Sequence, residues 1–552
     1  MGAFGRVRKD QYFIGFFAHF AVIATASVAR STSMQLPRDM AQMNAKELRD
    51  LAALLFAQVT QQSEQLKQRD QEIKYKQLKI DQLTHEMAVL KRWQFGQRSE
   101  KLDPGQRSLL DEAIDADLEA IEREIEALQT KRPNRPKEIP RRTALPAHLP
   151  RRDVLHEPKN TVCRCGCQLE RIGEDISERL DYTPGSFEVE RHVRGKWVCR
   201  RCETLVQDPI PAQIIDKGIP TAGLLAHVLV SKFADHTSLY RLAGIFERAD
   251  VHVPPSTLGA WVGACGFELS PLAEAMKADL LRRAVLHADE TPVSMLKPGL
   301  GHTHRAYIWS YGSTQFDDAF PLVVYDFTES RGGHHARAFL GDWGGKLVCD
   351  DFAGYKALFK RSVTEVGCMA HARRQFEKLK DSKRSEVAAE ALIFYGLLYD
   401  IEANAREQLL DAAGRQRWRQ QHARPVADHL REWLTRQRFK VPDGSAIAKA
   451  IKYSLGRWKA LTRYIDDGDL PIDNNWLENR IRPISIGRKN WLFAGSLRGG
   501  QRAAVIMSLI QSAKLNRHDP YRYLKDVLER LPTQPASRLD ELLPHRWRPP
   551  AS

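Results

Sequence analysis

The chain has 552 residues, of which 43% are hydrophobic, and 84 Lys and Arg face 69 Asp and Glu, for a net charge of +15. This length exceeds one ordinary domain and predicts about three or four, each able to bury a core. Eight cysteines in so long a chain exclude a disulfide scaffold. The basic excess suits a polyanionic partner such as nucleic acid, with a basic but otherwise ordinary enzyme as the alternative.

The N-terminal segment is basic and then apolar, as in a signal peptide. Basic residues precede the apolar stretch Tyr12–Ala29, which ends in small side chains. At 18 residues, and with His19 inside it, this stretch is marginal for a membrane span. A chain that works on nucleic acid should not be exported, so we expect residues 1–33 to precede the true start or to form an apolar arm, with real targeting as the alternative. The candidate starts are Met34, Met40 and Met43.

Residues 44–130 predict a helical oligomerisation region. Between Leu48 and Leu90 an apolar residue recurs at every seventh position, whereas polar residues interrupt the second seam, as in a coiled coil of modest strength. The regular seam consists of Ala52, Val59, Leu66, Ile73, Ile80 and Met87. A long helix packed on its own chain is the alternative. A second, acidic helix follows, with apolar residues at helical spacing from Leu110 to Leu128.

A basic, proline-rich linker is expected at residues 131–152, either as a solvated tether or in contact with a phosphate backbone. Residues 153–212 then hold a cysteine cluster that predicts a zinc-finger-like domain, because two close thiolate pairs brought together by a hairpin supply four ligands for Zn²⁺. The candidate ligands are Cys199 and Cys202 with Cys163 and Cys167, Cys165 being the replacement within the second pair. A finger without metal is the alternative. The segment Glu188–Arg194 alternates like a strand.

Residues 213–280 predict a helical block. Ser238–Arg248 has the pattern of one helix, Ala249–Pro254 that of a turn, and Ser256 is the expected cap of the next helix. The pair resembles a helix-turn-helix, in which the second helix enters the major groove of DNA. A helical hairpin with a purely structural role has the same pattern.

From residue 284 on, short apolar runs predict strands. The first run ends on Asp289, and a later one, Lys346–Cys349, ends on Asp350 and Asp351. The other expected elements are strands at 306–310, 321–326 and 363–368 and helices near 334–343 and 355–360. This order is that of an RNase H-like sheet, in which acids at the ends of neighbouring strands converge. Carboxylates in this arrangement hold Mg²⁺ for phosphodiester chemistry, although an Asp at a strand end is also a common turn residue.

Residues 472–496 carry the most distinctive motif of the chain. Asn-Asn-x-x-Glu-Asn-x-Ile-Arg-Pro, which includes Glu478, is followed by Gly-Arg-Lys-Asn-Trp-Leu-Phe-Ala-Gly-Ser. In both blocks the chain resembles the transposases of the insertion-sequence sixty-six family, the TnpC type. The likeness covers nearly the whole chain after about residue 35, although the cysteine cluster departs from the family's usual Cys-x-x-Cys-Gly opening.

The resemblance implies a DDE transposase with a multidomain α/β fold. Its RNase H-like catalytic core would span residues 281–510, with a helical insertion at about 380–470, before a C-terminal tail domain at 511–552. The implied catalytic acids, which would hold Mg²⁺ or Mn²⁺, are Asp289, Asp350 and Glu478. Asp350 matches the second acid of the family's Asp-Gly-Tyr-Ala-Gly stretch, and Asp351 replaces its glycine.

Basic residues near these acids are candidates for DNA binding. His371-Ala-Arg-Arg374 resembles a family motif, and six Lys and Arg stand between Glu478 and Arg502, where phosphate contact is expected of several. The expected DNA-binding residues are His371, Arg373, Arg374, Arg480, Arg482, Arg488 and Lys489. Structural ion pairs are the alternative for the His371–Arg374 motif. Trp491 and Phe493 are interpreted as core residues, with stacking on a displaced base as the alternative.

The function that this resemblance implies is binding of the element's ends, followed by metal-dependent cleavage and strand transfer. The expected partners are double-stranded DNA (terminal inverted repeats and target), further copies of this chain, and small companion proteins of the element. We expect a cytoplasmic, nucleoid-associated protein with no membrane contact. Nothing predicts a nucleotide cofactor, because no glycine-rich loop followed by Lys-Ser or Lys-Thr is present. An inactive or domesticated DNA-binding protein and a nuclease of the same fold are the alternatives.

Overall fold

The computed structural model describes residues 45–96, 104–128 and 145–549, apart from 159–160, 163–165, 184, 216–217, 298–301, 318–319 and 384. The arm expected at residues 1–33 and most of the expected linker therefore lie outside the described residues. No helix in the described ranges is long and apolar enough to cross a membrane.

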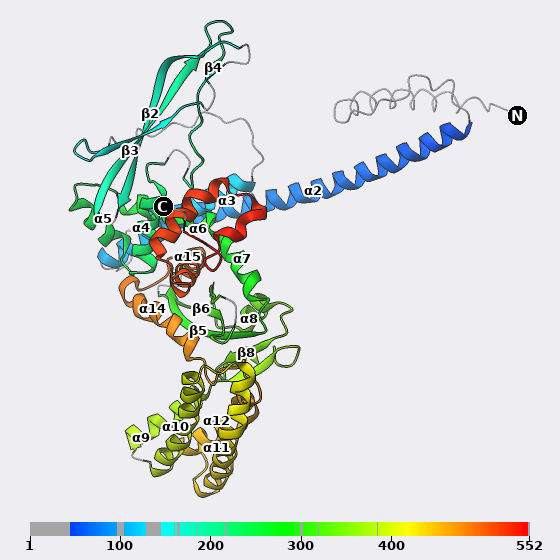
Figure 1. Cartoon of the computed structure of the whole chain (residues 1–552), viewed down its shortest axis with the longest axis vertical. Helices are drawn as coiled ribbons and strands as arrows, with labels where there is room; N and C mark the ends of the chain where they lie inside the picture. The colour runs from blue at the N-terminus through cyan, green and yellow to red at the C-terminus, as the bar shows by residue number, and fades with distance from the viewer. Residues whose placement is uncertain are drawn as a thin grey trace, which may run out of the picture. The chain divides into compact units, whose positions relative to one another are not determined.

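The chain divides into two units, Met1–Lys79 and Ile80–Ser552, and the long helix α2 (Ala45–Gly96) runs from the first into the second (Figure 1). On α2, Leu66 and Ile73 of the regular seam are 60% and 63% exposed. The second predicted helix is present as α3 (Pro104–Leu128). The sequence pattern therefore predicted both helices, while self-association through the seam stays a prediction.

Helix α3 packs closely on α6 (Pro255–Glu268). A Cβ atom on Gly263 of α6 would stand 2.3 Å from the carbonyl oxygen of Ala116 on α3, so only glycine allows this approach.

The cysteine-bearing region folds around a small sheet. Its strands are β1 (Arg151–His156), β2 (Glu170–Thr183), β3 (Ser186–Val198) and β4 (Leu205–Val206). β2 and β3 form a long antiparallel hairpin, and β1 lies parallel to β3 on its other side. The strand predicted at 188–194 lies within β3. The expected linker boundary at residue 152 is wrong by two residues, because the backbone of Arg151 and Arg152 already pairs with β3.

Four helices follow: α4 (Ala222–Phe233), α5 (Leu239–Glu247), α6 and α7 (Ser270–Leu280). Ser238 caps α5 by accepting from the backbone N–H of Arg241. Ser256 does not cap α6 as expected: the cap is Pro254, and the fixed φ of Pro255 starts the helix two residues earlier. The apolar side of α6 packs on α3, α4, α5 and α15 (Leu497–Leu515), so this chain itself encloses the helix expected to enter a DNA groove.

A five-stranded mixed sheet forms the centre of the second unit, in the order β7-β6-β5-β8-β9. The strands are β5 (Val285–Met295), β6 (His304–Ser313), β7 (Val323–Thr328), β8 (Lys346–Cys349) and β9 (Thr364–Gly367). β6 and β7 run antiparallel to their neighbours, whereas β8 and β9 run parallel to β5. The sequence predicted each of these strands, but β5 does not end at Asp289. Its pairing with β6 continues to Met295, so Asp289 lies inside the strand.

Between β7 and β9 the chain forms α8 (Gly333–Leu340) and the short 3-10 turn η2 (Ala353–Tyr355). A helix was expected at 355–360, and that expectation is wrong. The buried Tyr355 hydroxyl donates to Glu290 at 2.8 Å, and Gly354 lies against Gly333, so tertiary contacts hold this segment as a single turn.

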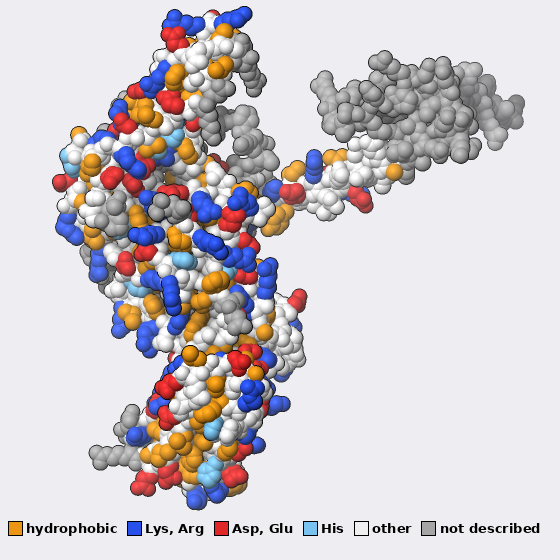
Figure 2. Space-filling model, viewed as in Figure 1, with side chains coloured by type: hydrophobic (Ala, Val, Ile, Leu, Met, Phe, Trp, Pro, Cys, Tyr) orange, Lys and Arg blue, Asp and Glu red, His pale blue; other side chains and the backbone are white. Residues whose placement is uncertain are grey.

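Helices follow β9 from Met369 on and fill the range of about 380–470 in which a helical insertion was expected. It comprises α9 (Met369–Lys383), α10 (Glu386–Glu407), α11 (Ala412–Lys440), α12 (Ala446–Gly456), α13 (Trp458–Thr462) and η3 (Arg463–Asp466). These helices share a core of their own that reaches back to β8 and β9. Figure 2 shows hydrophobic side chains on the surface of this body, in agreement with the exposure of Ile393 and Phe439.

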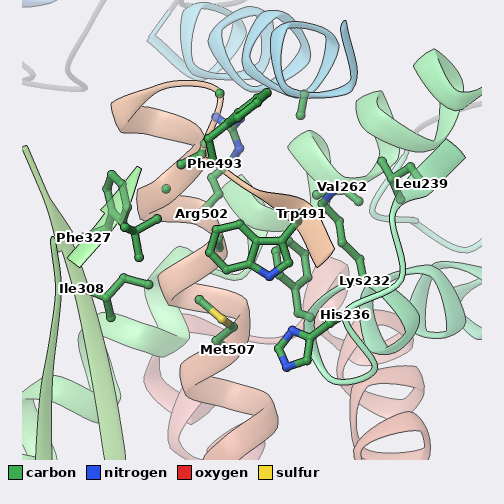
Figure 3. A pocket seen from close by; sticks show the side chains of 18 of the residues that line it. Lys232, His236, Leu239, Val262, Ile308, Phe327, Trp491, Phe493, Arg502 and Met507 are labelled. Carbon is green, nitrogen blue, oxygen red and sulfur yellow. The ribbon is translucent and has the colours of Figure 1, made fainter. Parts of the chain in front are cut away.

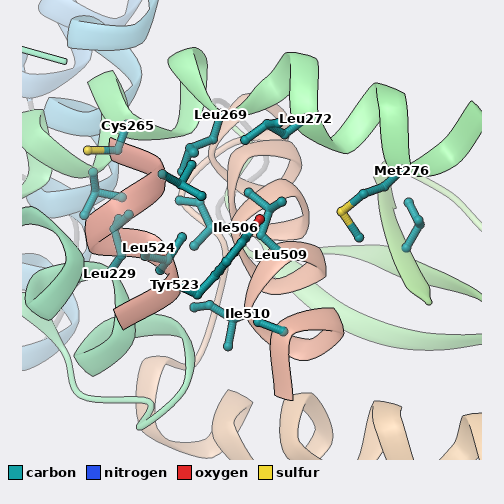
Figure 4. Close-up of a cluster of buried hydrophobic side chains, with 14 of the residues drawn as sticks. Leu229, Cys265, Leu269, Leu272, Met276, Ile506, Leu509, Ile510, Tyr523 and Leu524 are labelled. Atoms are coloured by element: carbon teal, nitrogen blue, oxygen red, sulfur yellow. The ribbon is translucent and has the colours of Figure 1, made fainter. Parts of the chain in front are cut away.

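The C-terminal part returns to the central sheet. It contains α14 (Asn475–Trp491), α15, α16 (Pro520–Arg530), η4 (Leu531–Thr533) and η5 (Ala536–Leu542). Ser508 and Ser512 of α15 accept from backbone N–H groups of the edge strand β7, so the helix covers that edge. Figure 4 shows α15 and α16 packed with α4, α6 and α7 through a shared core. Helix α15 crosses the expected domain boundary at 510–511 and joins the tail to the core.

Candidate functional site

Asp289 and Asp350 stand level with each other on neighbouring parallel strands. The register pairs Val285 with Lys346 and His287 with Val348, and continued by two residues it sets Asp289 opposite Asp350. β8 ends at Cys349, so at Asp289 the strand β5 is no longer paired with β8. Parallel strands thus carry both aspartates toward the same region, Asp289 within β5 and Asp350 directly after β8.

The electrostatics of Asp289 show which acids face it. Burial, followed by the charges of Glu290, Glu478 and Asp350, raises the pKa of Asp289 well above its usual range. Asp351 is not among these neighbours. It forms ion pairs with Lys356 at 2.7 Å and Arg457 at 3.3 Å. Asp351 is thus held by two cations, whereas the charge of Asp350 acts on Asp289.

Asn474 anchors the helix that carries Glu478. It is fully buried at the N-terminus of α14, and its backbone carbonyl accepts from the N–H of Glu478 at 3.1 Å. Its side-chain Nδ2 donates to the carbonyl of Ala288 at 3.0 Å, and its Oδ1 contacts Nδ1 of His287 at 2.7 Å. Both partners belong to β5, so these bonds tie the first turn of α14 to the residues around Asp289.

The Glu478 carboxylate lies beside two residues of α9. Nη2 of Arg374 donates to its Oε2 at 3.2 Å, and Nδ1 of His371 lies 3.6 Å from its Oε1. Oε1 of Glu478 and Nδ1 of His371 are buried and make no hydrogen bond to any described residue. Two of the residues expected to bind DNA, His371 and Arg374, therefore face a catalytic candidate.

A buried network that the sequence did not predict lies on the other face of β5. Glu290 accepts from Nε and Nη2 of Arg331, at 2.8 and 2.5 Å, and from the hydroxyl of Tyr355. The Arg331 guanidinium also lies 3.9 Å from the ring centroid of Phe352, whose backbone N–H donates to Asp350. The network thus fastens the turn that follows Asp350. Arg331 and Tyr355 lie 41 and 65 residues from Glu290 in the sequence, so no local sequence pattern predicts this network.

The other basic residues expected to bind DNA form two groups, those that contact other residues of this chain and those that are exposed. Arg373 pairs with Glu377 at 3.0 Å, Arg480 stacks 4.6 Å over Trp476, and Arg488 donates to the carbonyl of Pro292 at 2.6 Å. These three are engaged within the chain. Two further candidates, Arg482 and Lys489, are exposed on α14 and make no ion pair within the part of the chain that the structure describes.

Two of the six basic residues between Glu478 and Arg502 hold the N-terminal helices, which corrects the expectation of phosphate contact for this pair. Arg498 contacts Glu86 of α2 and Glu124 of α3, and Arg502 pairs with the buried Asp117. These acids lie in distant sequence, so the basic cluster alone did not reveal their role.

Trp491 and Phe493 line an apolar pocket between the sheet and α15 (Figure 3). Trp491 packs against the cluster that contains Phe327 and Met507. This agrees with the interpretation of Trp491 as a core residue.

The finger residues gather at one end of the β2–β3 hairpin. Glu170 pairs with Val198, so Cys167 and Cys199 flank the same end of the two strands. Cys199 and Cys202 sit on a tight turn, in which the N–H of residue 203 donates to the carbonyl of Cys199 at 2.7 Å. Nη1 of Arg201 lies 3.9 Å from Sγ of Cys167. Cys163 and Cys165 lie outside the described residues, and the other three expected ligands, Cys167, Cys199 and Cys202, are thiols near this end of the hairpin.

Four family models match successive parts of this chain. The model described as "Transposase IS66 family" matches residues 217–502, and the IS66 C-terminal element matches 508–545. The zinc-finger binding domain of transposase IS66 matches 160–203, and the model described as "Transposase C of IS166 homeodomain" matches 82–154. The first of these alone covers more than half of the chain.

Relatives in Sinorhizobium fredii match along most of their length. The uncharacterized protein y4jD is 36% identical over 488 residues, which are 84% of this chain and 94% of that protein. The uncharacterized protein y4qI is also 36% identical, over 86% of this chain and 90% of its own.

These matches define a transposase with a zinc-finger domain, a class of protein whose partner is DNA. The chain belongs to the IS66 family of transposases. The resemblance seen in the motif at 472–496 is thereby confirmed, and the zinc-finger match indicates that residues 160–203 bind Zn²⁺.

Proposed function

We propose that this chain is the DDE transposase of an insertion sequence, and that it cleaves the ends of its element and joins them to target DNA with Asp289, Asp350 and Glu478. The observation that carries the proposal is the level register of Asp289 and Asp350, combined with an α14 whose first turn is anchored to β5 by Asn474. Rigid strands and an anchored helix start hold catalytic groups better than loops do.

The strand order supports an RNase H-like core. A long central strand lies between two antiparallel strands on one side and two parallel strands on the other, as the order β7-β6-β5-β8-β9 describes. The acids on β5 and after β8 then belong to the middle of the sheet. Glu478 arrives from a helix after the insertion, as the family pattern implies.

The three carboxylates fit a pair of divalent cations such as Mg²⁺ or Mn²⁺. Their oxygens are the ligands that Mg²⁺ prefers. Burial, followed by the charges of Glu290, Glu478 and Asp350, raises the pKa of Asp289, and a bound cation would favour its ionised form. When bound, such ions supply an activated attacking oxygen and stabilise the leaving oxygen. Asp289, Asp350 and Glu478 would hold them.

The reaction we propose has two phosphoryl transfers. Water attacks the phosphodiester at the element's end, the bond to the 3′-oxygen breaks, and that oxygen leaves as a free 3′-hydroxyl. The 3′-hydroxyl then attacks a target phosphodiester and forms a bond to its phosphorus, while the bond to the target's 3′-oxygen breaks and that oxygen takes the proton. Neither step forms a bond between protein and DNA. The protein's task is to align the two strands and to hold the reacting phosphate beside its carboxylates.

DNA binding is assigned to several surfaces. Arg482 and Lys489, which are exposed on the same helix as Glu478, would contact the backbone near the cut. Zn²⁺ would be held by Cys199 and Cys202 together with Cys163 and Cys167, with Cys165 as the replacement within the second pair. The exposed seam on α2 would join further copies of the chain, and companion proteins of the element are expected to act with it.

An assay with labelled element ends and a target plasmid tests the proposal. The wild-type chain with Mg²⁺ should give joined products, and Asp289→Asn or Glu478→Gln should abolish both cleavage and joining. Cleavage without joining would favour a nuclease of the same fold. Binding without cleavage would favour an inactive DNA-binding protein. Both outcomes contradict the proposal.

A further inference from the structure

A second group of metal-binding side chains lies beside the proposed catalytic acids. Ligand atoms of Cys368, His371 and Glu478 all lie within 4.8 Å of one another. Cys368 directly follows β9, His371 is in the first turn of α9, and Glu478 is in the first turn of α14. Three elements thus deliver a thiol, an imidazole and a carboxylate to one place.

The polar atoms in this group lack partners. Oε1 of Glu478 and Nδ1 of His371 are buried, 3.6 Å apart, and without a hydrogen bond to any described residue. Buried polar atoms in folded proteins are nearly always paired. Two such atoms that face each other across a gap beside a thiol indicate a missing common partner.

The surroundings of Cys368 suit a metal-bound sulfur. Cys368 is fully buried, and its Sγ accepts the backbone N–H of Asn474 at 3.2 Å. Backbone N–H groups that donate to a thiolate support metal binding from outside the ligand set. The backbone N–H of Met369 donates to the carbonyl of Ile472 at 3.0 Å, which joins the exit of β9 to the entry of α14. The sulfur and the carboxylate are therefore held in fixed relation.

We propose that Cys368, His371 and Glu478 bind a thiophilic divalent cation of the Zn²⁺ class, at a site distinct from the Mg²⁺ position between Asp289 and Asp350. A sulfur, a nitrogen and an oxygen ligand select zinc over magnesium, and three protein ligands leave a fourth position for water. The imidazole would carry its proton on Nε2, so its 3.4 Å contact with Arg374 is given up. Arg374 can keep its bond to Oε2 of Glu478.

The site shares Glu478 with the proposed catalytic centre. Zn²⁺ bound by Cys368 and His371 would compete for that carboxylate and so inhibit strand cleavage in Mg²⁺. This consequence rests on the proposed function, whereas binding of the cation itself does not.

Cobalt spectroscopy on the full chain tests the binding. The zinc finger is first silenced by Cys199→Ser with Cys202→Ser, and Co²⁺ is added as the probe. We expect a thiolate-to-cobalt absorption band that Zn²⁺ displaces and that additional Cys368→Ser abolishes. Cys265→Ser, which removes a buried cysteine of α6 outside the group, should leave the band intact. A band that survives Cys368→Ser, or no band at all, overturns the proposal.

A second variant covers the case in which Cys368→Ser impairs folding. His371→Gln keeps the thiol and should weaken Co²⁺ binding by about tenfold or more, with an unchanged melting temperature in the absence of metal. Unchanged affinity in that variant contradicts the proposal. Inhibition of cleavage by Zn²⁺, which Cys368→Ser should relieve, is measured in a separate assay. A chain that binds Co²⁺ but cleaves no DNA would contradict the proposed function and leave the metal site supported.

Discussion

Asn474 donates its side-chain amide to the carbonyl of Ala288, the residue before Asp289, over 3.0 Å. The same residue directly precedes α14, and its backbone carbonyl accepts from the backbone N–H of Glu478. One buried side chain therefore connects the strand that bears the first proposed catalytic acid to the helix that bears the third.

Asn474→Ala should impair catalysis more than it impairs folding. The variant leaves the Ala288 carbonyl and the His287 imidazole without their partner, which costs about 1–3 kcal/mol of unfolding free energy. A displacement of Glu478 of about 1 Å should lower the rate of strand cleavage by about a hundredfold. Urea unfolding and cleavage kinetics measure the two effects. A loss of stability with cleavage at the wild-type rate would show that Asn474 does not position Glu478.

The pH dependence of stability should report on Asp289. Burial and the neighbouring carboxylates raise its pKa in the folded chain, so between the ordinary and the raised pKa the folded state binds a proton that the unfolded state has released. The stability of the Mg²⁺-free chain should therefore fall as pH rises through this interval. Asp289→Asn should flatten that fall and raise the melting temperature at neutral pH.

Mg²⁺ provides the control for Asp289. Added at neutral pH, it should stabilise the wild-type chain and leave Asp289→Asn nearly unchanged, because the cation offsets a repulsion that the variant lacks. Melting curves at a series of pH values, with and without Mg²⁺, decide the matter. Equal pH dependence in both chains would mean that Asp289 is not the group that titrates.

The buried Arg419–Glu402 pair should be essential to the fold of the insertion. Nε and Nη2 of Arg419 donate to Glu402 at 2.7 and 2.6 Å, and its Nη1 donates to three backbone carbonyls between Tyr464 and Leu470. Arg419→Met leaves a buried carboxylate unpaired and should cost about 3–5 kcal/mol of unfolding free energy. The matched change Arg424→Met, at a more exposed pair, should cost less than about 1 kcal/mol. Equal losses in urea unfolding would contradict this account.

Arg482 and Lys489 should contribute to DNA affinity through phosphate contacts. Each change to Ala should weaken binding to all sequences alike and reduce the salt slope of log K by about 1. Arg488→Ala is the control, because Arg488 is held by the Pro292 carbonyl and should affect stability instead. Filter binding over a range of salt concentrations makes the comparison. An unchanged slope in both Arg482→Ala and Lys489→Ala would remove them from the interface.

Local patterns were enough to predict the elements that carry the strand acids. The run Lys346–Cys349 is a strand with those bounds, in agreement with its short length and apolar character, which favour a buried strand. The family motif implied Glu478 as the third acid, and the structure has it in the first turn of α14. The sequence also left Asp350 and Asp351 as competing choices, and contacts with Lys356 and Arg457 now set Asp351 apart.

Contacts between distant segments could not be predicted. Tyr355 was expected to begin a helix, yet its bond to Glu290, 65 residues away, holds it in a short turn. Arg502 was grouped with residues near DNA, yet it pairs with Asp117, 385 residues away. Helix α6 was expected as the second helix of a helix-turn-helix-like pair, but Gly263 admits α3 against it. In each case the partner, and not the local pattern, decides the role.

Strand transfer by Asp350→Asn and Asp351→Asn, measured side by side with wild-type chain, element ends and Mg²⁺, tests the assignment of the catalytic acids most directly. Loss of a carboxylate that holds the cations should cost several kcal/mol of transition-state stabilisation, so Asp350→Asn should lower the rate by about a hundredfold or more. Asp351→Asn, which removes only partly exposed ion pairs, should stay within a few-fold of wild type, by roughly the worth of such pairs. A chain that tolerates Asp350→Asn and fails with Asp351→Asn would contradict the account.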